Sequence, residues 1–272
     1  INSTLARLAQ TVAGSRASGE VGSSTMVSSL ATGASLPISV SSRADNCRAS
    51  SLKALFSTGV SDGALVSPGG RNGKTFFSGS AKADARERWR HDWRIPEDAF
   101  VVLHVGSTVD RKNLPLVIQT VARLRQQTDA YLLQVGGRFS AEQEQLIDRL
   151  ELRGVVRSVA AADETTLRRA YRVADVLLFP SLYEGFGFPV LEAFASGLPV
   201  VTSGAGGLKE VGGDAAIVVE GRDPAAYMQA LEQVSEDSDE RDELIEKGWA
   251  RARQFTWQRT AAQTAEVYRP LF

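Results

Sequence analysis

Two glutamates, Glu184 and Glu192, stand eight positions apart across a glycine-rich turn and a proline. The apolar run before them, residues 176–179, is typical of a buried strand in a parallel sheet, and Pro189 fits the first turn of a following helix. Free N–H groups at a helix start suit an anion or a ring of hydroxyl groups, and the glycines let the backbone approach a ligand. The two carboxylates could therefore hold two separate parts of one elongated ligand. The alternative is that they only complement the helix dipole.

Two adjacent cations, Arg111 and Lys112, follow an earlier apolar run at residues 101–105. Fixed cations at the carboxyl edge of a sheet can stabilise a developing negative charge without a metal ion. The alternative is a solvated pair at a helix start, which is electrostatically unfavourable there. This pattern favours an anionic ligand.

Other residues that could do chemistry have simpler interpretations. His104 lies inside an apolar run and is expected in the core, whereas His91 lies in a charged helix and is expected to face solvent. The Asp237-Ser238-Asp239 string falls in a polar turn far from any strand end, so we interpret it as solvated. No cluster of histidine, cysteine and aspartate has metal-ligand spacing, so no metal site is predicted.

The elements that must position these residues form an alternating series from residue 81 onward. Strands are expected at 101–105, 131–135, 155–159, 176–179, 199–202 and 216–219. Helices are expected at 81–93, 113–127, 141–152, 164–173, 223–234, 239–254 and 258–270, with another starting near Pro189 and Thr256 capping the last. This alternation predicts the α/β class, a Rossmann-like doubly wound parallel sheet whose ligands bind beyond the carboxyl ends of the strands.

The composition excludes several other classes of protein. The chain has 272 residues, 43% of them hydrophobic and 23% charged, with a net charge of −1, which gives no electrostatic footprint for nucleic acid. A single cysteine, Cys47, excludes an internal disulfide. No apolar run approaches a membrane span of about 20 residues and no signal peptide is visible, so a cytoplasmic location is the default, with peripheral membrane contact left open.

Residues 1–80 differ from the rest, being rich in Ser, Ala, Gly and Thr with weak hydrophobic periodicity. On composition this region favours loop or partial disorder, with short elements at 3–13, 36–40 and 50–56. It contains no histidine. It is too short for a complete domain of repeated strand–helix units.

The run Glu-Gly-Phe-Gly-Phe-Pro-Val-Leu-Glu at 184–192 resembles the Glu-x7-Glu motif of retaining glycosyltransferases of the GT-B fold, family four (glycosyl transferases group 1). The resemblance covers roughly residues 60–272 and matches the donor-binding C-terminal half of those enzymes. It implies metal-independent transfer of a sugar, as a hexosyltransferase, from a nucleotide-diphosphate sugar to an acceptor hydroxyl with retention at the anomeric carbon. No cofactor is implied, because the nucleotide sugar is a substrate.

By the same resemblance, Glu184 faces the transferred sugar and Glu192 holds the ribose, while Arg111 and Lys112 hold the diphosphate. Retention is expected through front-face attack, in which the leaving phosphate takes the acceptor's proton. The chain departs from the usual motif at 106–107, with Gly-Ser in place of Gly-Arg. The further donor-binding residues implied are Gly106, Gly136, Gly185, Phe186, Gly187, Gly206 and Gly207.

The resemblance divides the chain at residue 80. Residues 1–80 are interpreted as a truncated or vestigial acceptor domain with the inter-domain crossing, and 81–272 as the donor-binding domain. The alternative function is a nucleotide-sugar binding module without transfer activity, or one that needs a partner chain or a second copy for the acceptor half. The acceptor is open among saccharide, lipid and small molecule.

Overall fold

The computed structural model describes residues 80–269, with the backbone alone at 80–85 and 258. The predictions made for residues 1–79 and 270–272 lie outside the described residues and stay predictions, as does the division at residue 80.

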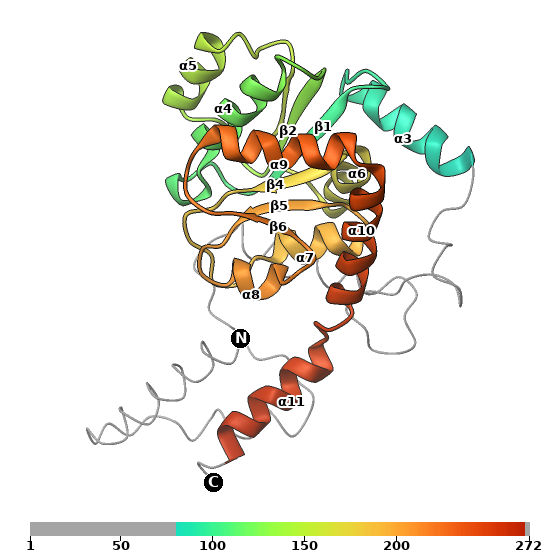
Figure 1. Cartoon of the computed structure of the whole chain (residues 1–272), viewed down its shortest axis with the longest axis vertical. Coiled ribbons are helices and arrows are strands. Elements are labelled where there is room, and N and C mark those ends of the chain that lie inside the picture. The colour runs from blue at the N-terminus through green and yellow to red at the C-terminus, as the bar shows by residue number, and fades with distance from the viewer. Residues whose placement is uncertain (1–79, 270–272) are drawn as a thin grey trace.

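The described part of the chain contains one parallel sheet of six strands in the order β3-β2-β1-β4-β5-β6 (Figure 1). The strands are β1 (Phe100–Val105), β2 (Ala130–Val135), β3 (Val156–Val159), β4 (Val176–Phe179), β5 (Val200–Ser203) and β6 (Ile217–Val219). The chain first adds strands on one side of β1, then crosses to β4 and adds the rest on the other side. The predicted doubly wound α/β fold is therefore confirmed.

Helices cover both faces of the sheet because the strand side chains alternate between two apolar clusters. In β1, Val101, Leu103 and Val105 belong to one cluster and Val102 to the other. The first cluster includes residues of α6 (Glu164–Val173), α7 (Phe188–Ala195) and α8 (Leu208–Gly212). The second includes residues of α4 (Leu114–Leu124), α5 (Ala141–Arg149) and α9 (Pro224–Glu236).

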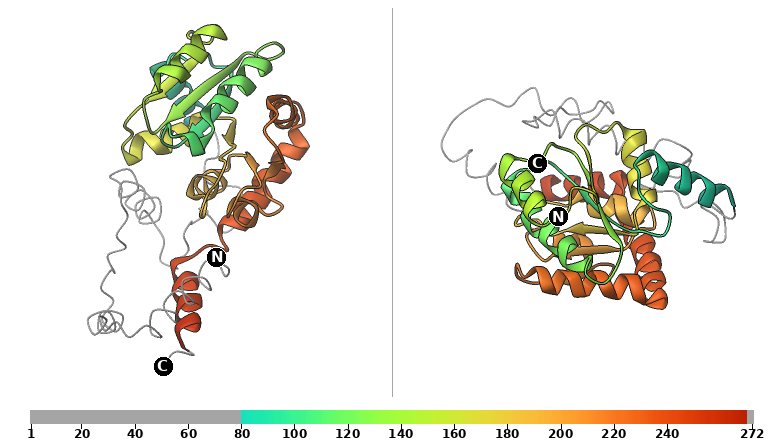
Figure 2. Two further views of the ribbon diagram at one scale, coloured as in Figure 1. Left: turned by 90° about the vertical axis from the view of Figure 1, so that its left-hand side faces the viewer. Right: turned by 90° about the horizontal axis from the view of Figure 1, so that it is seen from above.

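Two other helices complete the body of the domain. The helix α3 (Ser80–Asp92) packs beside α6, and α10 (Ser238–Ala252) packs against both α7 and α9. The last helix, α11 (Trp257–Tyr268), extends away from the body in Figure 1 and in the left view of Figure 2. The Thr256 hydroxyl accepts a hydrogen bond from the Arg259 amide at the start of α11, which confirms the predicted cap.

Several helix boundaries differ from the predicted ones. Helix α4 begins at Leu114 because Asn113 has φ 55°, and it ends at Leu124 rather than at residue 127. Helix α5 ends at Arg149 rather than at residue 152, just before Glu151 with φ 57°. Helix α8, which the sequence did not predict, begins at Leu208 directly after Gly206 and Gly207.

The amino edge of the sheet is fixed by a cluster around Asp175, the residue before β4. Arg90 of α3 is 3% exposed and lies 2.8 Å from the Asp175 carboxylate, which also pairs with Arg86 and accepts a hydrogen bond from the Val101 amide at 2.7 Å. Burial lowers the pKa of the Arg90 guanidinium, and the charge of Asp175 opposes that shift. The cluster attaches α3 to the first residues of the central strands.

Candidate functional site

The predicted site residues gather at the opposite, carboxyl edge. The loop after β1 (106–113) and the loop after β4 (180–187) leave neighbouring strands that lie where the strand order reverses. Helices then leave these two loops toward opposite faces of the sheet. In doubly wound sheets such a switch point is the place where ligands bind.

Glu184 is the centre of this edge. The Arg111 guanidinium lies 3.0 Å and the Lys112 ammonium 2.5 Å from the same oxygen, Oε1, of its carboxylate. Glu184 is 9% exposed and the Lys112 side chain 1%, whereas the Arg111 side chain is 47% exposed. The structure thus brings Glu184 together with two predicted residues that lie more than seventy positions earlier in the sequence.

The buried position of Lys112 explains why this cation is fixed. A short 3-10 helix at Asp110–Lys112 turns its side chain inward, where the ammonium lies 4.6 Å from the centre of the Phe179 ring at the end of β4. A Cβ at Gly106 would come within 3.2 Å of the Lys112 stem. Lysine is almost never fully buried without a partner, so Glu184 and Lys112 hold each other in place. The interpretation of a solvated pair is wrong for Lys112.

The loops of this edge are joined by hydrogen bonds. The Leu182 amide donates to the Arg111 carbonyl at 2.8 Å, and the Asn113 side chain donates to the Pro180 carbonyl at 3.2 Å. The Gly207 amide, after β5, donates to the Glu184 carbonyl at 2.8 Å. Three loops therefore form one connected rim around the cation pair.

The glycines of the rim differ in which atoms a side chain at their position would meet. A Cβ at Gly206 would lie 2.3 Å from the Glu184 carbonyl oxygen, and one at Gly207 2.6 Å from that of Gly185, so both glycines are required by contact between loops. Gly187 has φ 103°, and a Cβ on it would lie 2.6 Å from Leu208. A Cβ at Gly185 would meet nothing within 4 Å. Of these four, Gly185 is the one whose surroundings are open to a ligand.

Two other predicted donor-binding residues also have structural contacts. Gly136, with φ 112°, lies against the Gly106 backbone, which a Cβ on it would approach within 3.0 Å. The Phe186 ring packs 4.7 Å from the Phe188 ring and 5.8 Å from the Phe255 ring. The partly buried Phe186 ring therefore has packing partners within the domain.

Glu192 lies in α7 and is 3% exposed. Its Oε2 accepts a hydrogen bond of 2.6 Å from the hydroxyl of Tyr171, a buried residue of α6. Sequence analysis missed Tyr171. The available signal was a tyrosine at an inward position of α6, because a buried hydroxyl requires a partner.

The remaining candidates behave as the sequence suggested. His104 is buried in β1 and its ring stacks on Phe179 at 6.2 Å, and His91 is exposed. Asp237 caps α10 through hydrogen bonds from the amides of Asp239 and Glu240. Within residues 80–269, no group of three or more His, Cys, Asp or Glu is placed to hold a metal ion. In the same range no helix has the length and hydropathy needed to cross a membrane.

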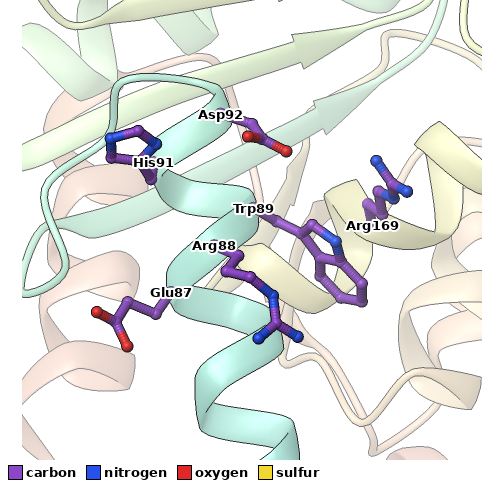
Figure 3. A pocket seen from close by; sticks show the side chains of 6 residues that line it. All are labelled: Glu87, Arg88, Trp89, His91, Asp92 and Arg169. Atoms are coloured by element: carbon purple, nitrogen blue, oxygen red, sulfur yellow. The ribbon is translucent and has the colours of Figure 1, made fainter.

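A cavity of about 340 Å³ lies beside α3, away from the predicted residues (Figure 3). The Trp89 ring lies in its wall, with the Arg169 guanidinium 5.6 Å from the ring centre. The other lining residues are Glu87, Arg88, His91 and Asp92. Acidic and basic side chains are mixed here, so the lining has no net preference for an anion.

Comparisons with known proteins point to one family. The family model described as glycosyl transferases group 1 matches residues 85–251, more than half of the chain. The O-antigen chain mannosyltransferase B of Escherichia coli is 34% identical over 173 residues, which are 62% of this chain and 45% of that protein. The chain spans about half the length of the relatives that it matches.

Solved structures agree on the fold. Sucrose-phosphate synthase from Thermosynechococcus elongatus gives a TM-score of 0.59 at 30% identity, over 72% of this chain and 50% of that one. Anabaena HepE, solved in complex with UDP and glucose, gives a TM-score of 0.61 at 21% identity, over 70% of this chain and 52% of that one. At that identity the second likeness concerns the fold alone.

Proposed function

The chain belongs to the glycosyl transferases group 1, and on this premise we propose that it binds a nucleotide-diphosphate sugar and serves in transfer of the sugar to an acceptor hydroxyl. The observation that carries the proposal is the convergence of Arg111, Lys112 and Glu184 at the switch point of the sheet. Two cations and a carboxylate at this place match a ligand with a diphosphate next to a ring of hydroxyl groups.

Arg111 is the cation that a diphosphate can reach most readily, because nearly half of its side chain is exposed. Lys112 is buried beneath Glu184 and contributes a fixed positive charge from below. When the diphosphate binds, it competes with Glu184 for Arg111. The Glu184 carboxylate, which Lys112 still holds, then accepts hydrogen bonds from sugar hydroxyls, while Gly185 leaves room for the sugar.

The proposed reaction retains the configuration at the anomeric carbon. The acceptor oxygen attacks the anomeric carbon from the face that the diphosphate leaves, and the bond between that carbon and the phosphate oxygen breaks. The departing diphosphate takes the acceptor's proton and carries the negative charge, which Arg111 and Lys112 stabilise. The scheme uses no organic cofactor, and the cation pair supplies the charge that a divalent ion could otherwise supply.

The donor assignment has support from a protein of the same fold, since HepE was solved with UDP and glucose. Glu192 is assigned to the ribose by the resemblance to the family motif, and it lies on the helix that begins at the end of the Glu184 loop.

The test uses the full chain. We expect calorimetry with UDP, GDP and ADP to give a measurable affinity for at least one of them. Incubation with the matching nucleotide sugars should release nucleotide when an acceptor is added, with or without EDTA. Binding without release would favour the nucleotide-sugar binding module, and loss of release in EDTA would contradict metal independence. Absence of binding to every nucleotide would refute the proposal.

A further inference from the structure

Glu192 is an unusual residue for its surroundings. It is the charged residue of an otherwise apolar helix, α7, and is 3% exposed. Its helix neighbours Val190, Leu191 and Phe194 are all core residues. A buried carboxylate is costly unless hydrogen bonds satisfy it, so its presence needs a reason other than packing.

A hydrogen bond from Tyr171 holds one oxygen of this carboxylate. Tyr171 is 1% exposed and its hydroxyl is 2.6 Å from Glu192 Oε2, the short distance typical of a hydroxyl that donates to a charged acceptor. The same hydroxyl is 3.4 Å from the Pro189 carbonyl in the first turn of α7. Tyr171 therefore contacts α7 both at its first turn and at the glutamate.

The direction of the two helices makes this contact relevant to the site. Helix α6 returns from the carboxyl edge of the sheet after β3, and side chains on a helix lean toward its N-terminus. The long Tyr171 side chain thus extends back toward the carboxyl edge, where α7 begins. Its ring is enclosed by the core, so the hydroxyl has little freedom to move.

We propose that Tyr171 is a positioning residue, which orients the Glu192 carboxylate toward the ribose hydroxyls of a nucleoside diphosphate. The inference rests on the proposed function and adds to it a residue from a different part of the chain. It makes a distinct prediction: removing the hydroxyl should weaken recognition of the ribose and leave recognition of the phosphates intact.

The experiment measures the affinity of the full chain for UDP, GDP or ADP, whichever binds most tightly, and for its 2′,3′-dideoxy counterpart. Wild-type protein should bind the ribonucleotide more tightly. In Tyr171→Phe the affinity for the ribonucleotide should fall about tenfold, the scale of one charged hydrogen bond, with the dideoxy affinity nearly unchanged. A purely structural role would change both affinities together, or only the melting temperature.

Tyr227→Phe is the matched control. Tyr227 is also fully buried and its hydroxyl lies 3.3 Å from the Val219 carbonyl, but it belongs to the cluster on the other face of the sheet. Burial raises the pKa of Tyr227 to about 12, so its hydroxyl is protonated in the assay. Removing it should leave the ratio of ribonucleotide to dideoxy affinity unchanged.

A double-mutant cycle guards against effects on folding. Glu192→Gln should itself reduce the affinity ratio, and adding Tyr171→Phe should then reduce it no further, because Tyr171 acts through Glu192. An unchanged ratio in Tyr171→Phe, or a second independent loss in the double variant, would overturn the inference. Wild-type binding without any preference for ribose would overturn it as well, yet leave nucleotide binding intact. Failure of the wild type to bind any nucleoside diphosphate would instead refute the proposed function.

Discussion

The two ends of strand β4 carry the same kind of group with different consequences. At the amino end, Asp175 pairs with Arg86 and Arg90, and beyond the carboxyl end Glu184 pairs with Arg111 and Lys112. Each is a carboxylate between two cations. The two clusters differ in which other groups the paired side chains bind.

At the amino end, the paired side chains also form hydrogen bonds with backbone groups. Arg90 also donates to the carbonyls of Val173 at 3.0 Å and Ala99 at 2.8 Å, and Asp175 accepts from the Val101 amide. At the carboxyl end, Glu184 is the hydrogen-bond partner of the Arg111 side chain within the described residues, and nearly half of that side chain faces solvent. The backbone partners at the amino end fit a structural role, whereas the exposed Arg111 side chain at the switch point of the sheet is accessible to a ligand.

The largest effect that we expect from this comparison is on stability at the amino end. Arg90→Ala should lower the free energy of unfolding by about 2–4 kcal/mol, because it removes one of the two cations on Asp175 and leaves the carbonyls of Val173 and Ala99 without this donor. Urea denaturation followed by circular dichroism measures it. A loss below about 1 kcal/mol, the usual worth of an exposed pair, would contradict the structural role.

The converse is expected at the carboxyl end. Arg111→Ala should weaken binding of nucleoside diphosphate by about tenfold or more, the scale of a lost charged hydrogen bond, with little change in unfolding. Arg153→Ala is the matched control. Arg153 is also exposed and pairs with two carboxylates, Glu144 and Asp148. These carboxylates lie on α5 and Arg153 lies in the turn after it. Calorimetry compares the two variants, and equal affinities would remove Arg111 from the site.

A smaller effect is expected from the residue that connects the two loops of the site. Asn113→Ala should lower the free energy of unfolding by about 1–2 kcal/mol, because alanine disfavours φ 55° and cannot donate to the Pro180 carbonyl. Asn113→Gly tolerates the backbone angle and loses the hydrogen bond alone. If both variants are equally unstable, the left-handed backbone contributes nothing.

The smallest effect is a pH dependence at the N-terminus of α6. Hydrogen bonds from Thr166 lower the pKa of the Asp163 carboxyl below its usual value near 3.9. Its stabilising contribution is therefore complete above that value and is lost as the pH falls through the lower pKa of the folded state. The stability difference between wild type and Asp163→Asn should shrink between pH 5 and strongly acid pH, about 2, in urea titrations. A difference that is constant with pH would contradict this.

Much of the architecture could be predicted from the sequence because strands such as β1, β2 and β4 are apolar runs that alternate with helices. The run at 176–179 and the helix at 164–173 were predicted at the observed bounds. The contact between Arg111 and Glu184 required the family motif, since a separation of 73 positions cannot be bridged by periodicity. It also depends on strand order, which alternation alone does not specify.

Other features escaped prediction for physical reasons. Tyr171 was not recognised because an inward tyrosine looks like any core residue until its hydroxyl partner is placed. The glycines Gly206 and Gly207 were predicted to approach a ligand, whereas the contacts that require them are with the backbone at Glu184 and Gly185. A glycine in the sequence does not show whether its missing side chain makes room for a ligand or for another loop.

Glu184 is held at both of its ends, since Arg111 and Lys112 bind its carboxylate while Gly207 binds its carbonyl. Substitutions in these loops should therefore have non-additive effects: a substitution near residue 206 shifts the backbone at Glu184, and its effect depends on the residues at 111 and 112. Libraries that exchange the three loops as a single block preserve this mutual dependence, whereas loops grafted one at a time break it.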